Sequence, residues 1–335
     1  MKITVLGAGS WGTALSMTLW KNKHDVSLWT HDEKEARYLK EEKKCMNLPD
    51  VQIPEEITIF TSLEEAIQGA EVLVYAVPSI FTRSMGERTK PFVQKDQILV
   101  TVSKGIEEST LFTMTDILEE FFPENKIVVL SGPSHAEEVS RFIPTTIVCA
   151  SKDEDAARTI QSIFISDTFR VYTNKDVLGV EIGAALKNVI ALSAGIADGL
   201  GYGDNTMAAL ITRGISEIAR LGQAMGCHLE TFAGLSGIGD LIVTCASKHS
   251  RNRRAGILIG QGKSYEEAMK EVGQVVEGVY AAKAAKKLGE KYHVELPIVR
   301  EVNAVLFEGK AAKDAVSDLM LRDSRSESPA VSFDK

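Results

Sequence analysis

The spacing of the hydrophobic positions divides the chain into two parts with different periodicities. In the first part, short apolar runs alternate with helical stretches. The runs predicted as strands are KITVL (2–6), DVSLW (25–29), ITIF (57–60), EVLVYAV (71–77), QILVTV (97–102), KIVVL (126–130), TTIVCA (145–150) and FRVY (169–172). Most are continuously apolar, which is typical of strands covered on both faces and therefore of a largely parallel sheet. With helix candidates between them, at 11–22, 62–69 and 153–164, they predict a doubly wound α/β domain over residues 1–176.

After that point the strand-like runs stop and helical spacing takes over. The stretches that carry it are 176–200, 206–226, 264–272, 278–292 and 296–309. They predict an all-α domain over residues 177–322. The polar end, residues 323–335, contains Pro329 and is predicted to be a disordered tail.

Composition narrows the functional class. The 335 residues carry a formal net charge of -8, which argues against nucleic acid or an anionic membrane as the main partner. The N-terminal apolar run is too short for a signal peptide, and we expect no stretch long enough to span a membrane. We therefore expect a cytoplasmic protein without stable membrane insertion.

The cysteine and histidine patterns argue against disulfide bonds and against a protein-built metal site. The four cysteines lie far apart without a CxxC pair and are interpreted as reduced thiols; they are Cys45, Cys149, Cys227 and Cys245. The six histidines show no HExxH, so no protein-built metal site is expected.

A glycine-rich stretch, GAGSWGTA, directly follows the first predicted strand and opens a predicted helix. Gly7 would allow the tight turn, Gly9 would let the backbone approach a pyrophosphate, and Gly12 would permit close helix–strand packing. The helix N-terminus at Ser10 and Trp11 would face the anion. The alternative is a plain strand–turn–helix junction, but the context favours a dinucleotide site.

The end of the second predicted strand bears on cofactor choice. NAD-specific sheets usually place an acidic residue there to hold the ribose hydroxyls. Here LWTHDE places Thr30 and His31 near that end, with Asp32 just beyond. His31 could tolerate a 2′-phosphate, but no arginine stands there to pair with one. Use of either NADH or NADPH is therefore expected.

Three other strand ends point toward the ligand edge of the sheet. They are YAVPS up to Ser79, TVSKG around Lys104, and LSGPSHA from Gly132 to Ala136. In the last of these, Ser134 could instead be the N-cap of a helix that begins at HAEEV.

Lys187 lies in an otherwise apolar predicted helix. Its helical neighbours are Gly183, Ala184, Ile190 and Ala191. Desolvation there would lower the ammonium pKa, which suits a group that exchanges a proton with a ketone oxygen. The alternative is a lysine that snorkels from the helix edge to water.

The stretch GLSGIGDLIVTCASKHSRNRR combines glycines with a basic run. Gly234, Gly237 and Gly239 predict a loop that ends in Asp240. Ser250 is placed as an N-cap, followed by Arg251, Asn252, Arg253 and Arg254 in the first helical turn. Basic residues there oppose the helix dipole, and a bound phosphate would resolve the conflict. The alternative is a solvated basic loop.

Further on, GQVVEGVYAA offers Val275 and Glu277. The acid could hold a ribose or the nicotinamide end of a dinucleotide, or could simply be an acidic residue at a helix start.

Together, seven stretches resemble the bacterial NAD(P)-dependent glycerol-3-phosphate dehydrogenases. They are GAGSWGTA, SKGIE, SGPSHAEEV, EIGAALKNVIALSAGIADGLGYGDNTMAALITRG, GLSGIGDLIVTC, SRNRRAG and VVEGVYAA, in this order from the first residue to about residue 320. The resemblance implies a Rossmann domain, a helical domain like the C-terminal domain of 6-phosphogluconate dehydrogenase, and reduction of dihydroxyacetone phosphate to sn-glycerol 3-phosphate for glycerophospholipid synthesis.

The resemblance also implies roles for particular residues. Cofactor contacts are implied for Ser10, Trp11, His31, Lys104, Ala136, Arg251, Val275 and Glu277. Substrate contacts are implied for Lys104, Gly132, Ser134, Lys187, Asp240, Ser250, Arg251 and Asn252, with Lys187 as the proton donor or acceptor. His31 departs from the arginine that is frequent in the family, so a strong preference for NADPH is not expected.

Two other functions remain open at this stage. One is a reductase of the same architecture that acts on a non-phosphorylated hydroxy acid or sugar acid. The other is a non-catalytic sensor of NAD(H). The apolar helical half could also support a homodimer.

Overall fold

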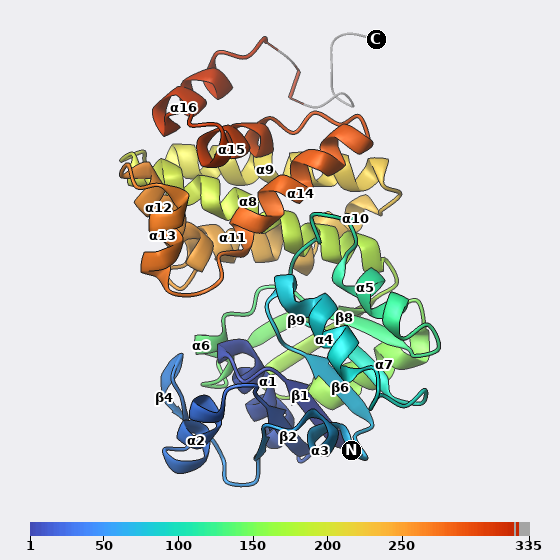
Figure 1. The fold of residues 1–335 in the computed structure, drawn as a ribbon. Coiled ribbons are helices and arrows are strands. Elements are labelled where there is room, and N and C mark those ends of the chain that lie inside the picture. The colour runs from blue at the N-terminus through green and yellow to red at the C-terminus, as the bar shows by residue number, and fades with distance from the viewer. Residues whose placement is uncertain (325, 328–335) are drawn as a thin grey trace.

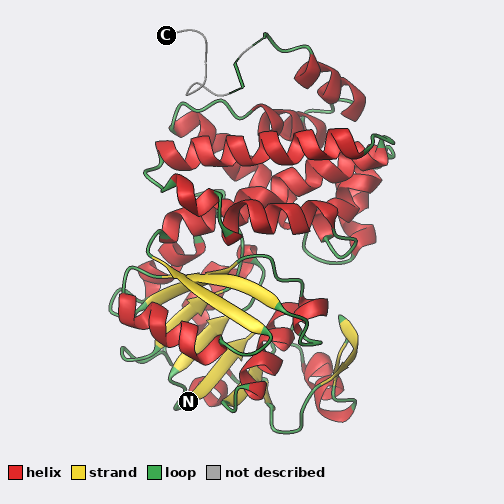
Figure 2. Ribbon diagram, turned by 180° about the vertical axis from the view of Figure 1, so that it is seen from behind, coloured by secondary structure: helices red, strands yellow, loops and turns green. Residues whose placement is uncertain are grey.

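A computed structural model of the chain describes residues 1–324 and 326–327. Residues 325 and 328–335, which belong to the predicted tail, lie outside the described residues. The first half of the chain forms an α/β layer structure and the second half forms a stack of helices above it (Figure 1). Figure 2 shows the same division from behind, with the strands of the large sheet gathered in one half.

The large sheet has eight strands in the order β10-β9-β8-β7-β6-β1-β2-β5. Their bounds are β1 (Lys2–Leu6), β2 (Asp25–Trp29), β5 (Thr58–Phe60), β6 (Val72–Tyr75), β7 (Ile98–Thr101), β8 (Ile127–Ser131), β9 (Thr145–Ala150) and β10 (Phe169–Asn174). All neighbours are parallel except β8 and β9, which pair antiparallel. The prediction of a largely parallel sheet built from these eight runs is confirmed.

Helices flank the sheet and connect its strands. They are α1 (Ser10–Lys21), α2 (Glu33–Glu41), α3 (Leu63–Ile67), η1 (Ser79–Phe81), α4 (Thr82–Thr89), α5 (Met114–Phe121), α6 (Ala136–Val139) and α7 (Glu154–Phe164). A small antiparallel hairpin, β3 (Lys44–Cys45) with β4 (Leu48–Gln52), also forms and was not predicted.

The second half is helical throughout its described residues, as predicted. The helices are α8 (Val177–Gly199), α9 (Asp204–Ala224), α10 (Leu229–Phe232), η2 (Leu235–Gly239), α11 (Asp240–Ala246), α12 (Arg251–Gly260), α13 (Tyr265–Val272), α14 (Glu277–Lys291), α15 (Pro297–Phe307) and α16 (Ala312–Met320). Helix α8 lies at the centre and packs against α9, α11, α12, α14 and α15.

Two segments among the described residues are long and apolar enough to cross a membrane by length and composition, Val177–Gly199 and Leu229–Ala246. The expectation that no stretch reaches that length was therefore wrong. The first segment is α8, and 89% of its most apolar window is buried inside the protein. A helix that is hydrophobic all round is also what the centre of a helical domain requires, so packing accounts for the composition of α8.

The predicted glycine loop before Asp240 is also wrong, because the chain is helical there. Residues Leu235–Gly239 form a π-helical turn that runs directly into α11. A side chain at Gly237 would overlap the backbone of Phe232, and one at Gly183 of α8 would lie 2.8 Å from the carbonyl oxygen of Ser236. These glycines permit close packing of helical backbones instead of forming a flexible connection.

Candidate functional site

A cleft of about 400 Å³ lies between the ligand edge of the sheet and the helical half. Both halves contribute to its wall. The predicted site residues that line it are Gly9, Ser10, Trp11, Lys104, Ser134, Ala136, Lys187, Asp240, Ser250, Arg251, Asn252, Val275 and Glu277. Gly7, Gly12, His31 and Gly132 are not part of its lining, although all but His31 support residues that are.

The glycine-rich turn between β1 and α1 has the geometry that the sequence predicted. Gly7 has a φ of +123°, which L side chains rarely adopt, and a side chain at Gly12 would overlap the carbonyl oxygen of Gly7. Gly9, in contrast, has open space where a side chain would project. The turn therefore leaves room for a ligand at Gly9, in front of the N-terminus of α1.

Trp11 provides a test of whether this turn suits a dinucleotide. Its indole Nε1 is buried and has no hydrogen-bond partner among the described residues. Trp11 lines the cleft, and an indole N–H that is buried usually finds an acceptor. The open space at Gly9 and this unpaired donor both fit a bound cofactor rich in oxygen acceptors.

The end of β2 places His31 away from the cleft lining. His31 is exposed, and its ring centroid lies 6.4 Å from that of Trp29. The side chain of Asp32 caps α2 by accepting from the backbone N–H groups of Lys34 and Glu35. Asp32 is thus already engaged, and the cofactor role of His31 stays a prediction.

Lys187 is buried in α8 and does not snorkel to water. Only 5% of its surface is exposed. Its Nζ donates to Oδ1 of Asp240 at 2.9 Å and to Oγ1 of Thr244 at 2.7 Å. Burial lowers the pKa of Lys187 to about 8; Asp240 opposes this shift, whereas Lys104 adds to it. An ammonium with that pKa can release and regain a proton near neutral pH.

Asp240 links Lys187 to a second lysine. Its Oδ2 accepts from Nζ of Lys104 at 2.7 Å, and Lys104 also donates to the carbonyl oxygen of Gly132 at 2.9 Å. Burial by itself would raise the pKa of Asp240, but Lys104 and Lys187 hold it below its usual value. One carboxylate therefore lies between two cations in the wall of the cleft.

The segment after β8 forms a tight turn into α6. Gly132 has a φ of +136°, and its carbonyl oxygen also accepts from Oγ of Ser134 at 2.8 Å. The alternative that Ser134 caps α6 was wrong, since His135 occupies the N-cap position. The serine side chain turns back to its own loop instead, because the helix starts one residue later.

The basic turn before α12 has the cap that was predicted. The side chain of Ser250 accepts from the backbone N–H of Arg253 at 3.2 Å. Arg251 and Arg254 are exposed and line the cleft, whereas Arg253 pairs with Asp198 at 2.6 Å. Two cationic side chains thus remain at the cleft, next to a helix N-terminus.

Sequence reasoning missed Asn188. It follows Lys187 in α8, and its Oδ1 accepts from Nδ2 of Asn252 at 2.9 Å, while Oδ1 of Asn252 accepts from the backbone N–H of Gly278 at 2.8 Å. These bonds tie α8, α12 and α14 together beside the catalytic candidate. The signal available in the sequence was an amide directly after the predicted catalytic lysine, in an apolar helix.

Thr244 was missed as well. Its hydroxyl accepts from Lys187 and donates to the carbonyl oxygen of Asp240 at 2.6 Å. It lies four residues after Asp240, on the same face of α11, and that spacing could have indicated it.

Val275 and Glu277 lie on the helical side of the cleft. Glu277 is the first residue of α14, and its carboxylate accepts from the backbone N–H of Ser79 at 3.0 Å and from the Ser79 hydroxyl. It is therefore both an acid at a helix start and a contact between the two halves.

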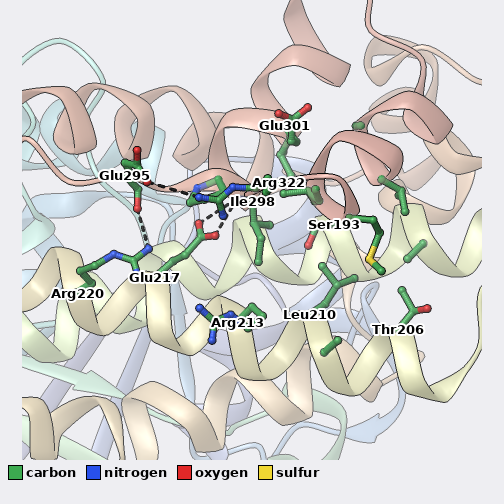
Figure 3. A pocket seen from close by; sticks show the side chains of 18 of the residues that line it. Ser193, Thr206, Leu210, Arg213, Glu217, Arg220, Glu295, Ile298, Glu301 and Arg322 are labelled. Carbon is green, nitrogen blue, oxygen red and sulfur yellow. Dashed lines mark hydrogen bonds and ion pairs between the residues drawn. The ribbon is translucent and has the colours of Figure 1, made fainter. Parts of the chain in front are cut away.

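A larger cavity of about 980 Å³ lies elsewhere in the helical half, among α8, α9, α15 and α16 (Figure 3). None of the predicted site residues lines it. Two buried glutamates, Glu217 and Glu301, line it. The carboxylate of Glu217 accepts from the backbone N–H of Ile298 at 2.9 Å, at the start of α15. The cavity is a structural feature of the helical half and not part of the cleft.

No group of three or more His, Cys, Asp or Glu side chains suited to a metal ion occurs in the part of the chain that the structure describes. All four cysteines are buried and have free thiols.

Comparison with known proteins identifies the family. The N-terminus model of the NAD-dependent glycerol-3-phosphate dehydrogenases matches residues 2–157, and their C-terminus model matches residues 176–317. A glycerol-3-phosphate dehydrogenase [NAD(P)+] of Agathobacter rectalis is 56% identical over 327 residues, which cover 97% of each chain. One of Fusobacterium nucleatum is 56% identical over 330 residues, covering 98% of each chain.

Solved structures agree with these matches. A crystal structure of glycerol-3-phosphate dehydrogenase from Coxiella burnetii superposes with a TM-score of 0.93 at 34% identity, covering 96% of this chain and 99% of that one. A D-mandelate dehydrogenase structure, at 15% identity and a TM-score of 0.66, shares the fold alone. The chain belongs to the NAD-dependent glycerol-3-phosphate dehydrogenase family.

Proposed function

We propose that this protein reduces dihydroxyacetone phosphate to sn-glycerol 3-phosphate, reversibly, with NADH or NADPH. The observation that carries the proposal is the hydrogen-bonded chain Lys187–Asp240–Lys104, which lies in one cleft with the glycine-rich turn and the basic turn of α12. The names of the relatives supply the substrate.

Lys187 is proposed as the proton donor to the ketone oxygen, and as the acceptor in the reverse direction. It can do this because burial brings its pKa to about 8, close to the working pH of a general acid–base group. A bound reduced nicotinamide supplies the hydride. As negative charge grows on the ketone oxygen, the Lys187 ammonium stabilises it and transfers the proton.

Asp240 and Lys104 are proposed to set the orientation and the protonation state of Lys187. Asp240 fixes the direction of the ammonium by accepting one of its three N–H groups, and Thr244 accepts a second. Lys104 adds a second positive charge on the other side of the carboxylate. Gly132 and Ser134 shape the turn against which Lys104 is held, and substrate contacts are proposed for both.

The basic turn is proposed to hold the phosphate of the substrate. The first turn of α12 offers backbone N–H groups together with the exposed guanidinium of Arg251. Substrate contacts are also proposed for Ser250, the N-cap of α12, and for Asn252 in its first turn. The contribution of the basic turn is to position the ketone relative to Lys187, not to perform chemistry.

The cofactor is proposed to lie along the sheet edge. Gly7, Gly9 and Gly12 shape the turn for its pyrophosphate, with Ser10 and Trp11 at the start of α1. Further contacts are proposed for His31, Lys104, Ala136, Arg251, Val275 and Glu277. The residues before 177 would form the cofactor domain, and residues 177–322 the substrate domain.

The experiment that tests the proposal follows the loss of reduced-nicotinamide absorbance with dihydroxyacetone phosphate, using NADH and NADPH in parallel. Rapid loss with either cofactor is expected. Turnover only on non-phosphorylated hydroxy or sugar acids would favour a different reductase of this architecture. Tight cofactor binding without turnover on any ketone would favour a sensor of NAD(H).

The cellular setting is part of the proposal. The product would be a precursor for glycerophospholipid synthesis, made in the cytoplasm without stable membrane insertion, by a chain that could form a homodimer. Neither nucleic acid nor a metal ion has a role in it.

A further inference from the structure

Ser79 connects the two halves of the protein at the cleft. It is the first residue of η1, just after β6, and it lies 198 positions before Glu277 in the sequence. Its backbone N–H donates to Oε1 of Glu277 at 3.0 Å, and its hydroxyl donates to Oε2. Both oxygens of one carboxylate are thus held by one residue of the opposite half.

This contact lies on a particular side of the cleft. In the strand order, β2 lies on one side of β1 and β6 lies on the other. The direction in which successive strands are added to the sheet therefore reverses between β1 and β6. A dinucleotide lies across such a reversal, with its adenosine over the end of β2 and its other half over the strands beyond. Ser79 follows β6, so the contact lies where the nicotinamide half would bind.

The surroundings hold Ser79 in one position. Only 8% of its surface is exposed. A side chain at Gly105, in the loop after β7, would overlap the Cβ and hydroxyl of Ser79 and would lie 3.6 Å from Oε2 of Glu277. Three segments, after β6, after β7 and at the start of α14, therefore pack together at this point. Because Gly105 directly follows Lys104, these segments also adjoin the chain Lys187–Asp240–Lys104.

Glu277 keeps capacity for a ligand although Ser79 binds it. A carboxylate has about four lone-pair positions, and the two donations from Ser79 use two of them. Glu277 lines the cleft, so its remaining acceptor capacity is available to donors of a bound molecule.

We infer that Ser79 is a positioning residue for the nicotinamide half of the cofactor and acts through Glu277. Its two hydrogen bonds fix the Glu277 carboxylate against the end of β6, so that the carboxylate meets the amide or hydroxyl donors of the cofactor in one orientation. This inference rests on the proposed function only in so far as the cleft takes NAD(P)H.

The test measures binding, not turnover. Ser79→Ala is expected to weaken the binding of NADH, followed by nicotinamide fluorescence, by about tenfold, because the Glu277 carboxylate is no longer held in the orientation that meets the cofactor. Binding of ADP-ribose, which lacks the nicotinamide, should not change. Glu277→Gln should weaken NADH similarly, and the double variant should be no worse than Glu277→Gln alone, since Ser79 acts through that carboxylate.

Lys287→Ala is the matched control. Lys287 also lies on α14 and also joins the two halves, through an exposed ion pair with Glu108 at 3.0 Å. Its loss should leave NADH binding unchanged. Unchanged NADH affinity in Ser79→Ala, an equal loss of ADP-ribose affinity, or additive effects in the double variant would each overturn the inference. A wild-type protein that binds NADH without reducing dihydroxyacetone phosphate would refute the proposed function and leave this test intact.

Discussion

Lys187 and Lys104 share a single carboxylate. Asp240 accepts from Lys187 at Oδ1 and from Lys104 at Oδ2, at 2.9 Å and 2.7 Å. The lysines come from different halves of the chain, so the carboxylate joins the sheet edge to the central helix. A buried carboxylate between two ammonium groups stays ionised and keeps both of them in place. In the mechanism that we propose, proton transfer by Lys187 therefore depends on Asp240.

Lys187→Ala is expected to bind cofactor normally and to lose most of its kcat. General acid–base groups typically contribute about 100- to 10,000-fold, so a loss in that range is expected in steady-state kinetics with dihydroxyacetone phosphate. Lys187→Met is the matched variant, because it fills the space without supplying a proton, and it should be equally impaired. Near-wild-type turnover in either variant would exclude Lys187 as the proton donor.

Asp240→Asn is expected to move the pH dependence of ketone reduction. The ammonium form of Lys187 is the one that donates, so kcat should fall as the pH rises through the pKa of about 8. Asp240 raises that pKa, and its neutralisation should move the fall in kcat to lower pH. The measurement is a pH profile of kcat for wild type and variant. A profile that keeps its position while kcat drops would mean that Asp240 does not set the charge of Lys187.

The strands of the sheet could be predicted because each is a local signal. A continuous apolar run such as residues 71–77 is recognisable without any knowledge of its neighbours. The β3–β4 hairpin gave no such signal, since β3 has only two residues and no apolar periodicity. The glycines before Asp240 misled because glycine serves both turns and close helix packing, and only the position of α8 decides between them.

For the candidate site, too, only features with a local sequence signal could be predicted. The glycine-rich turn, the N-cap at Ser250 and the buried lysine follow from short sequence stretches. The sequence indicated Ser79 only as the end of a predicted strand, and Asn188 only by its place beside Lys187. Their contacts could not be predicted in this way, because the partners of Asn188 and Ser79 lie 64 and 198 residues away in the chain. Side chains that act by holding other residues are recognised only once the tertiary structure places them together.

Arg251→Ala is expected to weaken binding more than catalysis. Arg251 is exposed at the cleft beside the first turn of α12, where we propose that phosphate binds. Loss of a charge-assisted contact should raise KM for dihydroxyacetone phosphate by about tenfold or more, with a smaller change in kcat. Lys248→Ala removes an exposed charge from the preceding loop and serves as the control. Unchanged affinities for both substrate and cofactor in titrations of Arg251→Ala would contradict the role.

His31→Arg is expected to shift cofactor preference toward NADPH. The residue is exposed at the end of β2, where an arginine could pair with a 2′-phosphate, and Asp32 is occupied as the cap of α2. The ratio of kcat/KM for NADPH to that for NADH should rise in the variant. An unchanged ratio would show that position 31 does not contact the ribose end of the cofactor.

Glu217→Gln is expected to stabilise the protein at pH 8 but not at pH 4. Burial raises the pKa of Glu217 to about 7, while Arg220 and Arg322 partly oppose the shift. A carboxyl whose pKa is higher in the folded state costs no stability below its ordinary value of 4.5 and its full cost above about 7. The ionisation of Glu217 therefore lowers the free energy of unfolding progressively as the pH rises from 4.5 to about 7. A shift of this size corresponds to about 3 kcal/mol between the two pH limits.

The glutamine keeps an oxygen that can accept from Ile298 but cannot ionise. The thermal midpoint of Glu217→Gln should therefore exceed that of wild type at pH 8, and the two should converge at pH 4. Glu230→Gln, which neutralises an exposed glutamate, is the control and should show no such difference. Equal midpoints of Glu217→Gln and wild type at both pH values would mean that Glu217 ionises at its ordinary pKa and that the cavity admits enough water to solvate it.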